Sequence, residues 1–254
     1  MSLGLVSLRK GMASGIPGHL QGSARLVIDS SMSAPADVDI DSAGAHTIEG
    51  RTWTMISADA DTATVTASGT RLVSSSANKV QLWTTIPFLD ADSWVCVGVT
   101  FAPVAMDKNA QTIQLRLGQA DGATDTQEDV VALLRRGTSS SYRLRCGYRG
   151  SSAWSFSSVD DNPMATSLPA SLQLMLWGHG NTWSARAGTG TGPPTFRGVT
   201  ATNGASARIC TRSAGSVKAA TPALLNRIKL AVVADSDNIE AFIKHVRVWV
   251  GSLA

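Results

Sequence analysis

An arginine-rich segment, Tyr142-Arg-Leu-Arg-Cys-Gly-Tyr-Arg, carries the side chains with the clearest chemical meaning in the sequence. Successive side chains of a strand point to opposite faces, so Arg143, Arg145 and Arg149 share one face and apolar residues share the other. A guanidinium donates paired hydrogen bonds to a carboxylate or a phosphate. The stripe therefore predicts a contact with an acidic glycan or an acidic partner subunit. The alternative is a solvated outer face balanced by nearby Asp residues.

Tryptophan is the second unusual residue type, with 7 Trp against 2 Tyr. Four residues surround the loop of one predicted hairpin: Trp177, His179, Asn181 and Trp183. An indole ring stacks on a sugar while Asn and His hydrogen-bond its hydroxyls, so this loop is a candidate ligand-binding site. Ordinary core packing of each Trp is the alternative, and it is the role expected for Trp53 and Trp249.

The sequence shows no local pattern for nucleophilic catalysis or for metal binding. It lacks a Gly-x-Ser-x-Gly segment, and its four His residues are scattered. The run Asp37-Val-Asp-Ile-Asp-Ser begins like a calcium loop, but its sixth position is not Gly and its twelfth is Ile48. A strand with an acidic outer face is the better interpretation. His and Cys spacing does not suit zinc, so neither a metal nor a cofactor is expected.

The composition favours β structure in the elements that position these side chains. Charged residues make up 16% of the 254 residues, and all of the 19 acidic residues except Glu49, Glu128 and Glu240 are Asp. Long helices held by Glu–Lys pairs are therefore not expected. The net charge of +3 is too small to indicate a nucleic-acid partner.

Short runs of alternating apolar residues, separated by turns, continue from Arg25 to the end of the chain. Such runs begin near Trp94, Ile113, Val130, Tyr142, Leu172, Thr182, Ile228 and Val246. About a dozen strands without intervening helices predict an antiparallel sandwich in a single domain, residues 25–254. Residues 1–24 form a Gly- and Ser-rich arm, which we expect to be ordered by its own domain or by a neighbouring subunit.

The three cysteines, Cys96, Cys146 and Cys210, form an odd set in strand-like surroundings. They are interpreted as buried thiols of a protein made in a reducing cytoplasm. The longest apolar run, from Trp94 to Met106, falls short of the roughly 18 residues that span a bilayer, so no membrane insertion is expected. Arg9 and Lys10 follow the first apolar stretch, which reverses the charge order of a signal peptide.

Three stretches resemble the concanavalin A-like, laminin G-like jelly roll. The first is Trp53-Thr-Met-Ile with Ala63-Thr-Val-Thr-Ala-Ser-Gly-Thr-Arg-Leu-Val, similar to the opening hairpin of that family. The second is the long strand from Ser93 to Phe101. The third is Ile228-Lys-Leu-Ala-Val-Val, a turn near Asp237, and Ile243-Lys-His-Val-Arg-Val-Trp, similar to its closing strands. The resemblance covers residues 45–254 and implies a two-sheet antiparallel jelly-roll sandwich.

Domains of this family serve as lectins, as glycan hydrolases, and as surface modules of phage capsids, tails and spikes. The hydrolases resemble one another in a Glu-x-Asp-x-Glu strand, and that motif is absent here. Retaining cleavage needs two carboxylates about 5 Å apart, which nothing in the sequence brings together. No catalytic residue is therefore expected.

The resemblance implies a non-enzymatic structural or surface-recognition component of a phage-like virion with carbohydrate-binding capacity. Such a protein would be made in the bacterial cytoplasm and then assembled into the virion. Its expected partners are other virion subunits, in a homo-oligomer, and a cell-surface glycan. A stand-alone lectin-like carbohydrate-binding module is the first alternative. A glycan hydrolase or lyase with a dispersed active site is the second.

Overall fold

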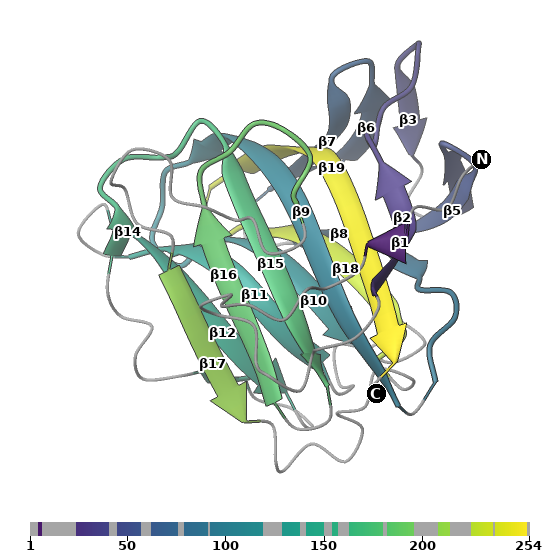
Figure 1. Cartoon of the computed structure of the whole chain (residues 1–254). Coiled ribbons are helices and arrows are strands. Elements are labelled where there is room, and N and C mark those ends of the chain that lie inside the picture. The colour runs from purple at the N-terminus through teal and green to yellow at the C-terminus, as the bar shows by residue number, and fades with distance from the viewer. Residues whose placement is uncertain are drawn as a thin grey trace.

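The chain folds into two antiparallel sheets that lie face to face (Figure 1). The structure is a computed structural model, and it describes residues 5–6, 24–40, 45–56, 62–75, 79–90, 92–118, 129–137, 141–149, 154–156, 163–179, 182–195, 208–213, 225–235 and 237–252. All regular structure in these residues is β, which confirms the predicted antiparallel sandwich. Within the same ranges there is no helix long and apolar enough to cross a membrane.

The first sheet has ten strands, in the order β17-β16-β15-β9-β19-β7-β6-β3, with β2 also paired to β19 and β1 paired to β2. Their bounds are β1 Leu5–Val6, β2 Ala24–Ser30, β3 Val38–Ile40, β6 Thr62–Thr66, β7 Gly69–Ser74, β9 Ser93–Met106, β15 Leu172–His179, β16 Thr182–Gly188, β17 Arg208–Ser213 and β19 Ile239–Ser252. The long strands β9 and β19 pair along most of their length and form the centre of this sheet.

The second sheet has nine strands, in the order β13-β12-β11-β10-β18-β8-β5-β4, with β14 also paired to β12. Their bounds are β4 Ala45–Ile48, β5 Arg51–Ile56, β8 Lys79–Thr85, β10 Thr112–Gly118, β11 Asp129–Arg136, β12 Tyr142–Arg149, β13 Trp154–Phe156, β14 Pro163–Ala165 and β18 Arg227–Val233. In Figure 1 this sheet lies behind the first one.

The core fills the space between the sheets because each central strand turns every second side chain inward. Val97, Val99 and Phe101 of β9 are fully buried, as are Leu115 and its apolar neighbours on β10. Trp53 also lies in this core, while Trp249 lies in a smaller apolar cluster on the outer side of the ten-stranded sheet, so both have the packing role predicted for them.

The short-loop hairpins expected from the sequence are present. β6 and β7 pair around a turn at Gly69, β11 pairs with β12, and β15 pairs with β16. Gly69 has φ +116, and a Cβ there would overlap the backbone carbonyl oxygen of Ile243, so this turn requires glycine. The two closing strands differ in placement, since β18 belongs to the nine-stranded sheet and β19 to the ten-stranded sheet.

Part of the N-terminal arm pairs with its own domain. Leu5 and Val6 form β1, which lies antiparallel to the start of β2 at Ala24 and Arg25. The remainder of residues 1–23 lies outside the described residues. The expectation that a neighbouring subunit also orders the arm stays a prediction.

The cysteines yield the first testable expectation. Cys96 and Cys146 are buried, and burial raises the pKa of the Cys96 thiol. The thiolate is the reactive form, so we expect neither residue to react with a thiol reagent at neutral pH until the protein unfolds. Mass spectrometry after brief labelling, with and without urea, measures this. Labelling of either residue in the native protein at the rate of a free thiol would contradict it. The side chain of Cys210 lies outside the described residues.

Candidate functional site

The arginine stripe lies on the outer face of the nine-stranded sheet. In β12, Tyr142, Leu144 and Cys146 are buried in the core, whereas Arg143 and Arg145 are half-buried on the opposite face. This alternation is the one that the sequence predicts. The backbone of Arg149 lies opposite Asp129 of β11, and the Arg149 side chain is outside the described residues.

Neighbouring strands add further cations to the same sheet. Arg143 lies opposite Arg135 of β11, so two arginines occupy neighbouring positions across the strands. Cationic residues of the five central strands are Lys79, Arg116, Arg135, Arg136, Arg143, Arg145, Arg149, Arg227 and Lys229. Arg136 stands opposite core-facing Tyr142 and forms an ion pair with Asp107, so it does not belong to the outer face. Asp129 is the one carboxylate in these strands. Such an excess of one sign raises the local concentration of oppositely charged ligands.

Asp129 is already engaged by two buried cations on this face. Its carboxylate accepts from Arg116 Nη2 and, at 2.9 Å, from Lys229 Nζ. The three side chains are only 1% to 3% exposed. Arg116 Nη1 also donates to Gln81 Oε1 at 3.3 Å. In this low-dielectric setting the ions depend on one another, and the two cations outnumber the one anion.

Gly118 makes room for this ion triad of Arg116, Asp129 and Lys229. It lies directly opposite Asp129 in the β10–β11 ladder. A Cβ at position 118 would overlap the Asp129 carboxylate and lie 2.6 Å from Lys229 Nζ. The triad was not predicted from the sequence, although Asp129 and Lys229 stand at outward positions of otherwise apolar strands. That charge pattern was the available signal, and the order of the strands was needed to interpret it.

A guanidinium stacked on an indole adds a flat surface to the same sheet. Arg227 of β18 lies 4.0 Å from the centre of the Trp83 ring of β8, a cation–π contact. Both side chains are half-buried on the outer face. This pair was not predicted either, because only the β8–β18 pairing brings the two residues together.

The tryptophan hairpin is arranged differently from the arginine stripe. Trp183 of β16 is 1% exposed in the main core, whereas Trp177 of β15 is 2% exposed in the outer cluster with Trp94 and Trp249. The two rings therefore lie on opposite faces of the ten-stranded sheet and form no common stacking surface. Core packing, the alternative interpretation, accounts for both positions. The side chain of His179 and all of Asn181 lie outside the described residues, and sugar binding by this loop stays a prediction.

The acidic run expected to form a strand does so, with Val38–Ile40 as the edge strand β3. Thr64 of β6 donates a hydrogen bond to Asp39 at 2.8 Å. In the part of the chain that the structure describes, no group of three or more His, Cys, Asp or Glu could hold a metal ion.

Comparison with solved structures identifies the fold class. The CBM2 module of the evolved Dit of Lactobacillus casei BL23 phage J-1 matches with a TM-score of 0.51 and 8% identity, covering 91% of this chain and 97% of that one. A protein of unknown function from Shewanella oneidensis MR-1 matches with a TM-score of 0.52 and 11% identity, covering 90% and 92%. Bacillus licheniformis beta-glucanase matches with a TM-score of 0.50 and 10% identity, covering 87% and 96%.

These identities show the fold alone, and that fold is a jelly-roll sandwich of the concanavalin A-like kind. No protein-family model and no curated protein sequence matches the chain. The likeness is thus one of architecture, consistent with the resemblance seen in the sequence.

Proposed function

We propose that the protein is a non-enzymatic component of a phage-like virion that binds an acidic glycan through the outer face of its nine-stranded sheet. The half-buried cations of that face, Arg135, Arg143, Arg145 and Arg227, are the observation that carries the proposal. A chain of sugar acids presents carboxylates at regular intervals, and guanidinium groups on adjacent strands suit them. The half-buried Arg227–Trp83 pair offers a flat surface for a sugar ring beside these charges.

The charges of the face favour binding over hydrolysis. Retaining and inverting glycosidases both use a pair of carboxylic groups. Among the described strands β8, β10, β11, β12 and β18, Asp129 is the one such group, and it forms ion pairs with Arg116 and Lys229. Release of reducing ends from polygalacturonate by the purified protein would contradict the non-enzymatic proposal.

The virion assignment is supported by the phage Dit module, which this chain resembles over nearly the full length of both. A stand-alone lectin-like module is the competing function. Mass spectrometry of purified particles separates the two. A virion component is found there in a fixed stoichiometry, whereas a stand-alone module is absent from particles and binds its glycan as an isolated protein.

Removing two charges of the stripe tests glycan binding directly. We expect Arg143→Gln with Arg145→Gln to weaken binding to immobilised polygalacturonate by about 2- to 30-fold at low salt, since each exposed charge contact contributes about 0.2–1 kcal/mol. The dependence of binding on salt should also flatten. Dextran, a neutral glucan, is the comparison ligand.

The matched control removes the same charge elsewhere. Arg71→Gln with Lys108→Gln breaks two exposed ion pairs, with Glu240 and Asp237, outside this face. Binding of the control should equal that of the wild type. An equal loss in both double variants would show that net charge alone attracts the polymer. Unchanged binding in both would contradict the assignment of the stripe.

A further inference from the structure

A cleft of about 380 Å³ opens on the outer face of the ten-stranded sheet, on the side of the sandwich opposite the arginine stripe. Half of its ten lining residues carry hydroxyl groups: Ser31, Ser33, Ser68, Ser171 and Thr191. Lys244 and His245 add nitrogen atoms, and Ala102 and Ala170 are among its apolar contacts. The Ser31 and Ser171 hydroxyls donate to the Glu49 carboxylate and the Gly190 carbonyl, and Ser31 is hydrogen-bonded to Ser33. Their oxygen lone pairs remain as acceptors, which suits a ligand whose own hydroxyl groups donate.

A β-bulge in β19 directs two polar side chains to this cleft. Ile243 pairs with Phe101 and His245 pairs with Thr100, so Lys244 is the extra residue between them. Bulges of this kind re-aim side chains and are frequent beside functional sites. Lys244 Nζ donates to the carbonyl oxygen of Ser68, which holds the ammonium group at the cleft.

The imidazole of His245 is suited to hydrogen bonding with hydroxyls. Burial and the nearby Arg247 lower its pKa, while Asp29 and Glu49 act in the opposite direction. The ring is therefore predominantly neutral at neutral pH, with one nitrogen as a donor and the other as an acceptor.

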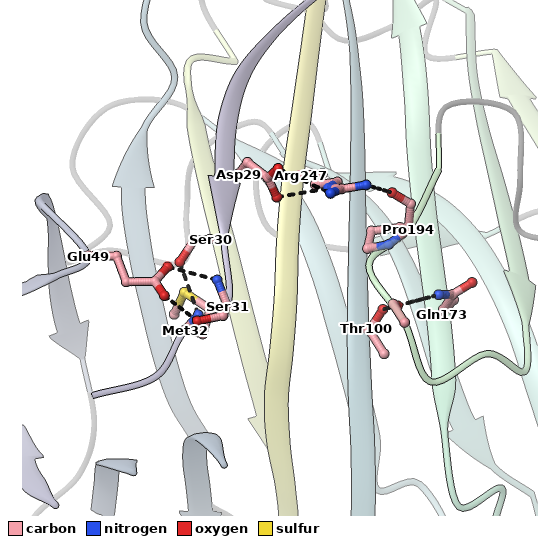
Figure 2. A network of polar contacts seen from close by, with 10 residues as sticks. Asp29, Ser30, Ser31, Met32, Glu49, Thr100, Gln173, Pro194 and Arg247 are labelled. Atoms are coloured by element: carbon pink, nitrogen blue, oxygen red, sulfur yellow. Dashed lines mark hydrogen bonds and ion pairs between the residues drawn. The ribbon is translucent and has the colours of Figure 1, made fainter. Parts of the chain in front are cut away.

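Polar contacts hold the chain on both sides of the cleft, and Figure 2 shows those of Glu49 with Ser31 and of Gln173 with Thr100. On one side, the Glu49 carboxylate accepts from the Ser31 backbone N–H at 2.7 Å and from the Ser31 hydroxyl. On the other, Thr100 Oγ1 and Gln173 Nε2 each donate to the Gly192 carbonyl at 2.8 Å. These bonds fasten the segment that carries Thr191 across the sheet.

The ion pair between Arg247 and Asp29 also holds the segment that carries Thr191 and Pro194. Arg247 is bidentate to Asp29, at 2.8 and 3.1 Å, and donates to the Pro194 carbonyl at 3.3 Å (Figure 2). The carboxylates of Asp29 and Glu49 are thus engaged within the protein. Because neither carboxylate pairs with Lys244, its ammonium charge is available to an anionic ligand in the cleft.

Backbone strain is present in the wall formed by residues 31–33. Met32 is fully buried with φ 53, a left-handed conformation that is uncommon for a residue other than glycine. The Ser30 hydroxyl accepts from its N–H at 3.1 Å, and the Thr70 hydroxyl donates to its carbonyl at 2.7 Å. Strained conformations held in this way concentrate at ligand sites.

We propose that this cleft is a second binding site, for a single acidic sugar ring such as a hexuronate, with Lys244 binding its carboxylate and the Ser and Thr hydroxyls binding its hydroxyl groups. The site is independent of the arginine stripe. With both sites the domain holds acidic glycan on two opposite faces, so one molecule can bridge two glycan segments.

Filling the cleft tests this site. Ala170 is exposed at the cleft, so Ala170→Trp occupies the space with little effect on folding. The matched control is Ser167→Trp, because Ser167 is exposed in the same loop but does not line the cleft. With the full chain and free galacturonic acid as the probe, titration followed by NMR should show saturable binding. Ala170→Trp should weaken it at least tenfold, and Ser167→Trp should leave it unchanged.

A charge variant separates this proposal from that of the stripe. Lys244→Gln should lower the affinity for galacturonic acid by about 2- to 5-fold while leaving that for neutral galactose unchanged. Arg143→Gln with Arg145→Gln should leave both affinities unchanged, whether or not it alters polymer binding. Absence of saturable binding to the wild type, or binding that survives Ala170→Trp, would overturn the second site.

Discussion

Replacing Asp129 with Asn should destabilise the protein by about 3–5 kcal/mol. The change is nearly isosteric but removes the only anion of a triad whose members are 1% to 3% exposed. Arg116 and Lys229 lie directly opposite each other on β10 and β18. Without Asp129 their two charges would remain buried and adjacent, with its carboxylate no longer between them. The midpoint of urea unfolding measures the loss.

Two further variants establish that the effect comes from the buried charges. Asp107→Asn removes the carboxylate of an exposed ion pair with Arg136, and its effect should stay within about 1 kcal/mol. Lys229→Met in the Asp129→Asn background removes one of the two buried cations and should restore part of the stability. If Asp129→Asn unfolded at the urea concentration of the wild type, the triad would have no structural importance.

Replacing Trp183 with Ala should cost a comparable 3–5 kcal/mol, roughly the penalty for removing a large ring from a packed core. The ring is 1% exposed and belongs to the main core between the sheets. Trp183→Phe keeps an aromatic ring in the core and should cost less. Thermal and urea unfolding of both variants measure these differences.

The same variants separate the two interpretations of the tryptophan hairpin. A packing role predicts a loss of stability with binding of neutral sugars unchanged in the molecules that remain folded. A stacking role predicts the reverse, a stable variant that no longer binds neutral sugar. A ring that stacks on a bound sugar contributes to binding and little to the packing of the core. Trp177→Ala tests the outer cluster in the same way.

Prediction from the sequence succeeded where the physical signal is local. Side chains alternate along a strand with a period of two, so the faces of β12 follow directly from the positions of Leu144 and Arg145. Short loops restrict the partner of a strand, which is why the β11–β12 and β15–β16 hairpins were predictable. The cationic character of β12 therefore follows without any knowledge of its neighbours.

Prediction was incomplete where the outcome depends on strands that are distant in the sequence. Asp129 and Lys229 meet because β10 lies between β11 and β18, an order that alternation does not specify. The need for glycine at position 118 arises only from that meeting. Likewise, the wall of the second cleft forms where the segment carrying Thr191 crosses strands β9 and β15 and is held by Thr100 and Gln173.

The amino-acid pattern was sufficient for the β class, for the inward and outward faces of the central strands, and for the placement of Arg143 and Arg145 on an outer face. Which charges neutralise one another, and where a cleft opens, depended on the folded arrangement of the sheets. Alternation is a property of the single chain at a spacing of two residues, whereas ion pairs and clefts need the order of strands within a sheet. That order results from packing many apolar side chains into one core, and no short segment encodes it.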